Sequence, residues 1–228
     1  MSNASVDSWK NSSKKVFLDQ FERNKKELTG QLARPPHWKI FIDWINKYHP
    51  KRVVDIGCGA GVYSLLHKFT SHKYEYNPYA NVEYIGYDYA EAAIEVAKEA
   101  WNDTKSTTKY PQKDCFYVKD YKDLKKEDML EGDGIVCNGL CGILENGDEC
   151  LRHILGLGVK NVLIQRQFVH DKPKEIESYD AYGMMTFGFK YNRKELLKDA
   201  KDNNYDIELV RLHGILDDHH DLIFTLKN

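Results

Sequence analysis

The chain of 228 residues lacks the features that mark secreted and membrane-spanning proteins. Its five cysteines are an odd number and include no Cys-x-x-Cys pair, so neither a disulfide framework nor a zinc finger is indicated. The first ten residues have no apolar stretch of the kind found in signal peptides, and no window holds the roughly 18 apolar residues of a membrane span. We therefore expect a reduced, cytoplasmic protein with no membrane partner.

An excess of positive charge is also missing. The chain has 33 Lys and Arg against 35 Asp and Glu, a formal net charge of -2, so no overall field attracts nucleic acid. Basic residues do gather in residues 9–39, but acids are interspersed there, which is typical of the solvated faces of helices. This balance favours a small-molecule substrate over a nucleic acid, and it does not determine the oligomeric state.

Short apolar runs alternate with helical segments through the middle of the chain, which indicates a parallel sheet covered on both faces. Strands are expected over residues 52–56, 82–88, 115–120, 132–138 and 160–168. Helices are expected over residues 61–72, 90–103 and 147–158.

The two ends of the chain follow other patterns. Two helices are expected before the first strand, and Pro35-Pro36 suits the entry to the second of them. After Phe168 we expect a long irregular segment over residues 169–191 and then a helix. Strand-like runs on either side of residues 215–220 predict a closing antiparallel hairpin.

The stretch DIGCGAG, residues 55–61, places three glycines in the turn after the first strand. Glycines at this density indicate positive φ angles, or a backbone that must stay bare against a ligand. In a doubly wound sheet this turn is a usual binding position. The dinucleotide fingerprint needs a small sixth residue, where this chain has Val62, so a nicotinamide-dependent oxidoreductase is disfavoured.

The stretch VVDIGCGAG resembles the signature of class I S-adenosylmethionine-dependent methyltransferases. The resemblance is clear over about residues 50 to 170, and the closing helix and hairpin extend it to the C-terminus. It implies an α/β fold with a doubly wound, mostly parallel seven-stranded sheet, helices on both faces, an antiparallel C-terminal hairpin and an N-terminal helical extension. We expect residues 1–50 to form a helical lid and residues 51–228 the methyltransferase domain. The implied cofactor is S-adenosylmethionine and the implied product S-adenosylhomocysteine.

The same resemblance assigns roles to residues at four successive strand ends. The glycine turn would lie against the methionine and ribose, Asp88 would accept the ribose hydroxyls, Asp120 would meet the adenine, and Asn138 would lie near the sulfonium. The expected cofactor-binding residues are Asp55, Gly57, Cys58, Gly59, Gly61, Asp88, Tyr89, Asp120, Tyr121 and Asn138. Simpler alternatives are a helix cap for Asp88 and turn-forming roles for Asp120 and Asn138.

Substrate-side residues are expected after the fifth strand and in the final hairpin. Tyr179 and Tyr182 belong to the long segment that would cover the substrate, and His213 and His219 would lie near its rim. His170 is the first candidate for a general base because it follows a strand end and an imidazole titrates near neutrality; a structural role is the alternative. Residues 217–220 carry metal-ligating side chains, but neighbours in a tight turn seldom converge on one ion, so no metal is expected.

The methyl acceptor is narrowed mainly by motifs that the chain lacks. No Asn/Asp-Pro-Pro-Tyr/Phe motif follows the fourth strand, and no proline precedes Cys137 or Cys141, so amino-directed DNA enzymes and cytosine-C5 enzymes are disfavoured. We expect O- or N-methylation of a small polar metabolite. A protein or RNA methyltransferase and a catalytically silent cofactor-binding regulatory subunit remain as alternatives.

Overall fold

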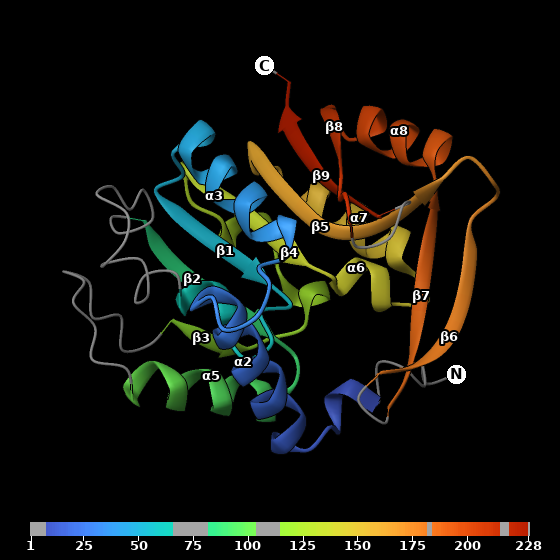
Figure 1. Cartoon of the computed structure of the whole chain (residues 1–228). Helices are drawn as coiled ribbons and strands as arrows, with labels where there is room; N and C mark the ends of the chain where they lie inside the picture. The colour runs from blue at the N-terminus through green and yellow to red at the C-terminus, as the bar shows by residue number, and fades with distance from the viewer. Residues whose placement is uncertain (1–7, 66–81, 104–114, 182–183, 215–218, 228) are drawn as a thin grey trace.

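The computed structural model describes residues 8–65, 82–103, 115–181, 184–214 and 219–227. Within them a mixed nine-stranded sheet forms the centre of the molecule, with helices on both faces (Figure 1). Its parallel part has the strand order β3-β2-β1-β4-β5, so the order reverses between β1 and β4, as predicted for a doubly wound fold. These strands are β1 (Arg52–Ile56), β2 (Glu83–Asp88), β3 (Phe116–Val118), β4 (Asp133–Asn138) and β5 (Asn161–His170).

The C-terminal hairpin forms the antiparallel strands that were predicted, but the sheet has nine strands instead of the seven expected. β9 (His219–Leu226) lies antiparallel between β5 and β8 (Tyr205–Arg211). The α/β class, the parallel order and the antiparallel closing strands are therefore confirmed.

Two further strands lie where an irregular segment was expected, and that expectation was wrong. β6 (Glu175–Ala181) and β7 (Met184–Asn192) form an antiparallel hairpin, and β7 also pairs with the last three residues of β5. Nearly every residue of β6 is exposed, so its sequence shows no alternation of buried and exposed side chains. The hairpin rises to one side of the sheet in Figure 1.

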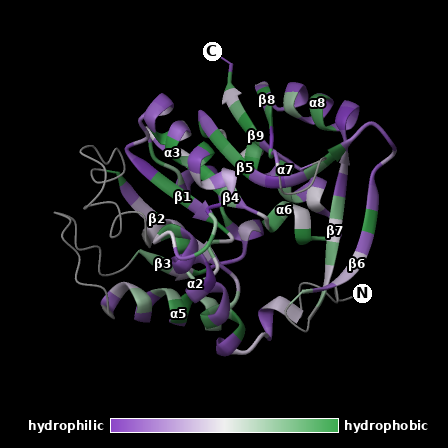
Figure 2. Ribbon diagram, viewed as in Figure 1, coloured by the Kyte–Doolittle hydropathy of each residue, from purple (hydrophilic) through white to green (hydrophobic). Residues whose placement is uncertain are grey.

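The helices form two layers, and each layer covers its own hydrophobic cluster. Helices α2 (Lys14–Leu28), α3 (Pro36–Tyr48) and α5 (Glu91–Asp103) cover one face, while α6 (Leu140–Ile143), α7 (Gly147–Gly156) and α8 (Arg193–Asp202) cover the other. Figure 2 shows hydrophilic and hydrophobic residues interspersed along α3, α5 and α8, as expected of helices that cover a sheet. Short 3₁₀ helices follow β1 (η1, Val62–Leu65) and β3 (η3, Tyr121–Asp123; η4, Lys126–Asp128). The rest of the helix expected over residues 61–72 lies outside the described residues.

The N-terminal segment crosses the molecule and reaches the β6–β7 hairpin. The indole N–H of Trp9 donates a 3.1 Å hydrogen bond to the Thr186 hydroxyl on β7. Lys14 on α2 forms a 2.5 Å ion pair with Glu99 on α5. These contacts place the N-terminal segment and the hairpin on the same side of the molecule. No helix in the described residues is long and apolar enough to span a bilayer.

All five cysteines are free and buried. Cys58 and Cys115 belong to the cluster under α2, α3 and α5, and the other three belong to the cluster under α6, α7 and α8. The Cys141 sulfur lies 3.9 Å from that of Cys137 and 3.6 Å from that of Cys150. In the described part of the chain no group of three or more His, Cys, Asp or Glu side chains could hold a metal ion.

Candidate active site

The three glycines of the turn after β1 serve different purposes. All three have positive φ, of 74° at Gly57, 52° at Gly59 and 72° at Gly61. A Cβ at Gly61 would lie 2.5 Å from the Phe116 ring, so this glycine allows close packing against β3. A Cβ at Gly59 would meet nothing within 4 Å, so this part of the turn faces open space. A Cβ at Gly57 would lie 3.0 Å from the Leu140 side chain, and Gly57 is the one of the three that lines the cavity at this edge of the sheet.

Asp88, the last residue of β2, connects this turn to the helix that follows β2. Its Oδ2 accepts a 2.9 Å hydrogen bond from the Gly59 N–H, and its Oδ1 accepts one of 2.9 Å from the Ala90 N–H. Burial raises the pKa of Asp88 to about 6, against the lowering effect of these N–H groups. The Tyr89 N–H also contributes to holding this carboxylate. The capping alternative is therefore real, and of about four lone-pair positions one remains for a ligand.

A cavity opens over the ends of β1, β2 and β3. Its lining residues are Gly57, Tyr87, Asp88, Tyr89, Lys119, Asp120, Tyr121, Lys122, Leu140, Leu144 and Asn146. Five of the predicted cofactor-binding residues, from three strand ends, are thereby brought to one place.

Sequence reasoning missed the other residues that line this cavity. Tyr87 and Lys119 stand next to predicted residues, and that proximity was the available signal. Leu140, Leu144 and Asn146 reach the cavity because α6 and the loop after it fold back over the end of β4. Nothing local in the sequence indicates that fold-back.

Asp120 and Tyr121 lie on the β3 side of the cavity. Asp120 Oδ1 accepts a 3.0 Å hydrogen bond from the Lys122 N–H and so caps η3. The Tyr121 ring meets the His153 ring edge-on, with centroids 5.7 Å apart. Both residues thus combine a local structural role with a place in the wall.

Asp55 and Cys58 lie beneath the turn, outside the cavity lining. The Tyr84 hydroxyl donates a 2.7 Å hydrogen bond to Asp55 Oδ2, and Asp55 Oδ1 has no hydrogen-bond partner among the described residues. Burial raises the pKa of Asp55 to about 7. The Cys58 thiol is buried and its sulfur lies 3.6 Å from the Gly59 carbonyl oxygen.

A buried polar network borders the site on the β5 side. Gln165 Nε2 donates to Asp221 Oδ2 at 2.6 Å and to the His37 carbonyl at 2.9 Å, while the Tyr63 hydroxyl donates to Gln165 Oε1. Burial raises the pKa of Asp221 to about 6. The network joins α3, η1, β5 and β9, and the run QRQ within an otherwise apolar strand was the signal for it.

Asn138, at the end of β4, lies on the same side. It pairs with Gln165 in the sheet, and its Oδ1 accepts a 2.6 Å hydrogen bond from Arg166 Nε. The cavity over β1 to β3 and this polar edge thus flank the end of β4 from opposite sides.

The predicted substrate-side residues are divided between two places. His170 and His219 both pack edge-on against Phe168, with ring centroids 5.7 and 5.2 Å from it. Tyr179 lies on β6 with 45% of its surface exposed, and His213 is exposed after β8. Tyr182 and residues 217–218 lie outside the described residues. The structure therefore brings together His170 and His219 but not His213.

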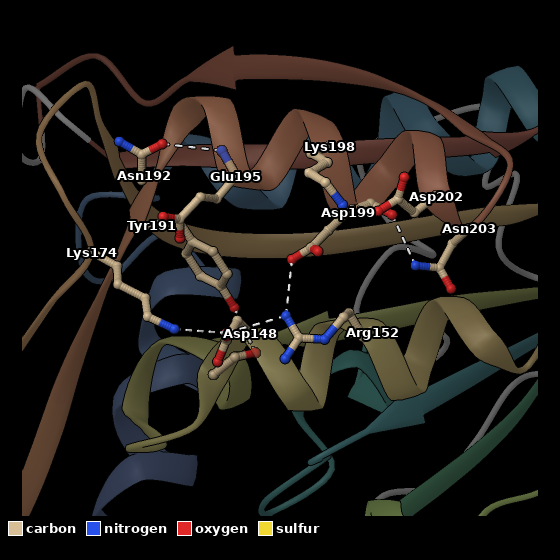
Figure 3. Close-up of polar contacts among 11 residues, drawn as sticks. Asp148, Arg152, Lys174, Tyr191, Asn192, Glu195, Lys198, Asp199, Asp202 and Asn203 are labelled. Carbon is tan, nitrogen blue, oxygen red and sulfur yellow. Dashed lines mark hydrogen bonds and ion pairs between the residues drawn. The ribbon is translucent and has the colours of Figure 1, made fainter.

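A second cavity, between α7, β7 and α8, is bordered by opposite charges that pair with one another (Figure 3). Asp148 lies 3.2 Å from Arg152 and 3.1 Å from Lys174, and Arg152 also lies 3.2 Å from Asp199. These ion pairs connect α7 to α8 and to the loop before β6. We assign them a structural role.

The comparisons with known proteins agree on one fold. A family described as "Methyltransferase domain" matches residues 49–214, and no curated protein matches the chain. A magnesium protoporphyrin IX methyltransferase from Synechocystis PCC 6803, solved with bound SAM, has a TM-score of 0.57 and 14% identity, covering 83% of this chain and 77% of its own.

Two further solved structures resemble this chain to a similar degree. For a putative S-adenosylmethionine-dependent methyltransferase from Listeria monocytogenes the TM-score is 0.59, the identity 12%, and the coverage 84% of this chain and 98% of that one. For one from Clostridium acetobutylicum ATCC 824 the values are 0.58 and 10%, with 92% and 99% covered.

Proposed function

The chain belongs to the methyltransferase-domain family, with S-adenosylmethionine as its cofactor, and on that premise we propose that it methylates an oxygen or nitrogen of a small polar metabolite. The observation that carries the proposal is the hydrogen bond from Trp9 to Thr186, which connects the N-terminal segment to the β6–β7 hairpin. Residues 1–50 would then act as a lid on a methyltransferase domain of residues 51–228. A methyl acceptor that such a lid encloses would be a small molecule. We expect the reaction to take place in the cytoplasm.

The cavity fits the cofactor in its chemistry. Gly57 lines the cavity and the neighbouring backbone at Gly59 is bare, which would give room for the methionine part. Asp88 would use its remaining lone pair for a ribose hydroxyl. Asp120 would accept the adenine amino group, with the Tyr121 ring and Leu140 against the base. Asn138 would lie near the sulfonium, and Asp55 and Cys58 would support the turn from below.

When bound, the cofactor supplies a methyl group on a positively charged sulfur, which is already a strong electrophile. The main work of the protein is therefore to orient the acceptor and exclude water, which contributes roughly 7 to 11 kcal/mol in well-aligned systems. His170 would take a proton from the acceptor, since its Nε2 is buried without a partner among the described residues. General-base help of this kind contributes about 10²- to 10⁴-fold. Tyr179, Tyr182, His213 and His219 would contribute to the acceptor side.

Docking of a nucleic acid on the N-terminal helices is not favoured by their charges. The basic residues that could form such a surface are partly paired with acids, as Arg23 is with Glu27 and Lys25 with Glu22. The exposed face of α2 is therefore mixed rather than basic, and a small-molecule substrate remains our proposal.

Calorimetric titration with S-adenosylmethionine, S-adenosylhomocysteine and NAD tests the cofactor site directly. We expect micromolar binding of the two sulfur ligands and none of NAD. A screen of small polar metabolites for methyl transfer then tests the acceptor class. Affinity for NAD alone would refute the assignment, and tight cofactor binding without turnover on any acceptor would favour a regulatory subunit.

A further inference from the structure

Arg166 has an unusual backbone conformation for a strand residue. Its φ is 60°, in the left-handed region, and the pairing of β5 with β9 shifts register between Ile164 and Gln167. Such a conformation is strained for a residue that carries a side chain. The Arg166 N–H donates a 2.8 Å hydrogen bond to the buried Asp221 carboxylate, which holds the bulge in place. Bulges commonly redirect a side chain at functional sites.

The Arg166 side chain is held as firmly as its backbone. Its Nε lies 2.6 Å from Asn138 Oδ1, and its Nη2 lies 3.5 Å from the Asn138 carbonyl oxygen. A Cβ at Gly139 would lie only 2.6 Å from Nη2, so the guanidinium occupies space that any larger residue at 139 would take. Even so, Arg166 is exposed. A charged group is thus fixed in orientation while open to solvent.

The charge of Arg166 acts on the buried Asp221 carboxylate, whose pKa it lowers, but the guanidinium itself has no ion-pair partner among the described residues. Arg52, Arg152 and Arg193 each form an ion pair with a carboxylate, but no ion pair joins Arg166 to any acid within the described residues. Its side-chain partners are the neutral oxygens of Asn138. A guanidinium has five N–H donors, so most of them remain for a ligand. An anion is the ligand that such a group binds best.

The neighbouring residues also favour an anion. His37, at the start of α3, is kept neutral because burial and the Arg166 charge lower its pKa to about 3. Its Nδ1 is buried and has no partner in the described part of the chain. His37 lies in the first turn of α3, where the positive end of the helix dipole favours a bound anion.

The position of Arg166 assigns this anion to the acceptor rather than to the cofactor. The cavity with the predicted adenine and ribose residues lies over β1, β2 and β3, whereas Arg166 lies beyond β4 in the strand order. Because Asn138 pairs with Gln165, Arg166 stands one residue past the end of β4, at the binding edge of the sheet.

We propose that Arg166 binds an anionic group, a carboxylate or a phosphate, of the methyl acceptor. The proposal rests on the proposed function and narrows its substrate class to small metabolites that carry a negative charge as well as the oxygen or nitrogen to be methylated. Arg166 is then a residue that determines specificity.

Ligand-observed NMR on the full chain saturated with S-adenosylhomocysteine tests this assignment. Benzoate and phenyl phosphate serve as anionic probes, and benzamide is the neutral probe. The variants are Arg166→Gln and Arg166→Lys, with Arg193→Gln as the matched control at an exposed arginine. Calorimetry with S-adenosylhomocysteine and a thermal unfolding midpoint are recorded for each protein.

We expect at least one anionic probe to bind the wild type and Arg193→Gln, with affinity at least tenfold lower in Arg166→Gln. Arg166→Lys should keep part of the affinity for the anionic probe, because it keeps the positive charge. We expect this variant to fold even if Arg166→Gln is unstable, so the test does not depend on one variant. Benzamide binding and S-adenosylhomocysteine affinity should be the same in all four proteins.

Three results would overturn the proposal. The first is that neither anionic probe binds the wild type. The second is that both probes bind Arg166→Gln as tightly as they bind the wild type. The third is a loss of S-adenosylhomocysteine affinity in Arg166→Gln with unchanged affinity for its decarboxylated analogue, which would assign Arg166 to the cofactor carboxylate. Failure of the wild type to bind S-adenosylhomocysteine would instead refute the proposed function.

Discussion

Asp88 Oδ2 accepts a 2.9 Å hydrogen bond from the Gly59 N–H, so the acid that ends β2 and the bare turn after β1 form one unit. The same carboxylate caps the start of α5 through Ala90. Replacing either residue is therefore expected to disturb the position of the other. Each residue can be replaced on its own, with its own control.

Gly59→Val should abolish binding of S-adenosylhomocysteine. The substitution strains a φ of 52° and places a branched side chain in the open space above the turn. Gly158→Val is the matched control, because Gly158 also has a positive φ, of 73°, but lies at the other end of the sheet, before β5. Both variants should lose about 1 to 2 kcal/mol of stability, and calorimetry should show lost binding only for Gly59→Val. Equal binding by both variants would place the cofactor elsewhere.

Asp88→Ala should weaken cofactor binding without unfolding the protein. Hydrogen bonds to a charged group contribute about 1.5 to 3 kcal/mol, so the affinity should fall by roughly ten- to a hundredfold. The lost cap on α5 should cost about 1 kcal/mol in urea unfolding. The exposed Asp123→Ala is the control in the same calorimetric titrations. An unchanged affinity in Asp88→Ala would reduce Asp88 to a helix cap.

His170→Ala should lower turnover more than cofactor affinity, provided that an acceptor is known. The imidazole would no longer take the acceptor proton, so turnover should fall by about 10²- to 10⁴-fold. His49→Ala, at the exposed C-terminal end of α3, is the control and should leave turnover unchanged. Unchanged turnover in His170→Ala at several pH values would remove this residue from the mechanism.

Asp55 should make the free energy of unfolding depend on pH. Burial raises its pKa from 3.8 to about 7, so the native state binds the proton more tightly than the unfolded state does. This contribution is fully present below about pH 4 and is lost as the pH rises through 7, at most about 1.4 kcal/mol for each pH unit. Urea unfolding from pH 4 to 8 should therefore show a steeper decline for wild type than for Asp55→Asn.

Asp88 and Asp221 also have raised pKa values. They therefore add to the decline of the free energy of unfolding with rising pH in both the wild type and Asp55→Asn. The comparison with Asp55→Asn cancels the contribution of Asp221. The charge of Asp88 helps to raise the pKa of Asp55, so the difference between the two proteins reports Asp55 together with its coupling to Asp88. Parallel curves for the two proteins would show that Asp55 is not the titrating group.

The parallel sheet and the residues at its strand ends were predictable because both follow from local patterns. Apolar runs mark β1, β2, β4 and β5, and the glycine turn marks where the first strand ends. Asp88 and Asp120 were singled out by the resemblance to class I methyltransferases, and the structure places both beside one cavity.

The β6–β7 hairpin and Arg166 could not be predicted, because they depend on contacts between distant parts of the chain. β6 carries almost no buried face and is held by its pairing with β7. The bulge at Arg166 depends on Asp221, which lies 55 residues later in the chain. No window of local sequence contains that relationship.

The two separate groups of buried cysteines give this protein an internal reporter of its own opening motions. Cys58 and Cys115 lie on one face of the sheet, and Cys137, Cys141 and Cys150 on the other. An alkylating reagent can reach either group only while its cluster is open, so the modification rate measures how often that cluster is exposed. Equal rates for the two groups would mean that the faces open as one cooperative unit; unequal rates would identify the face that opens first.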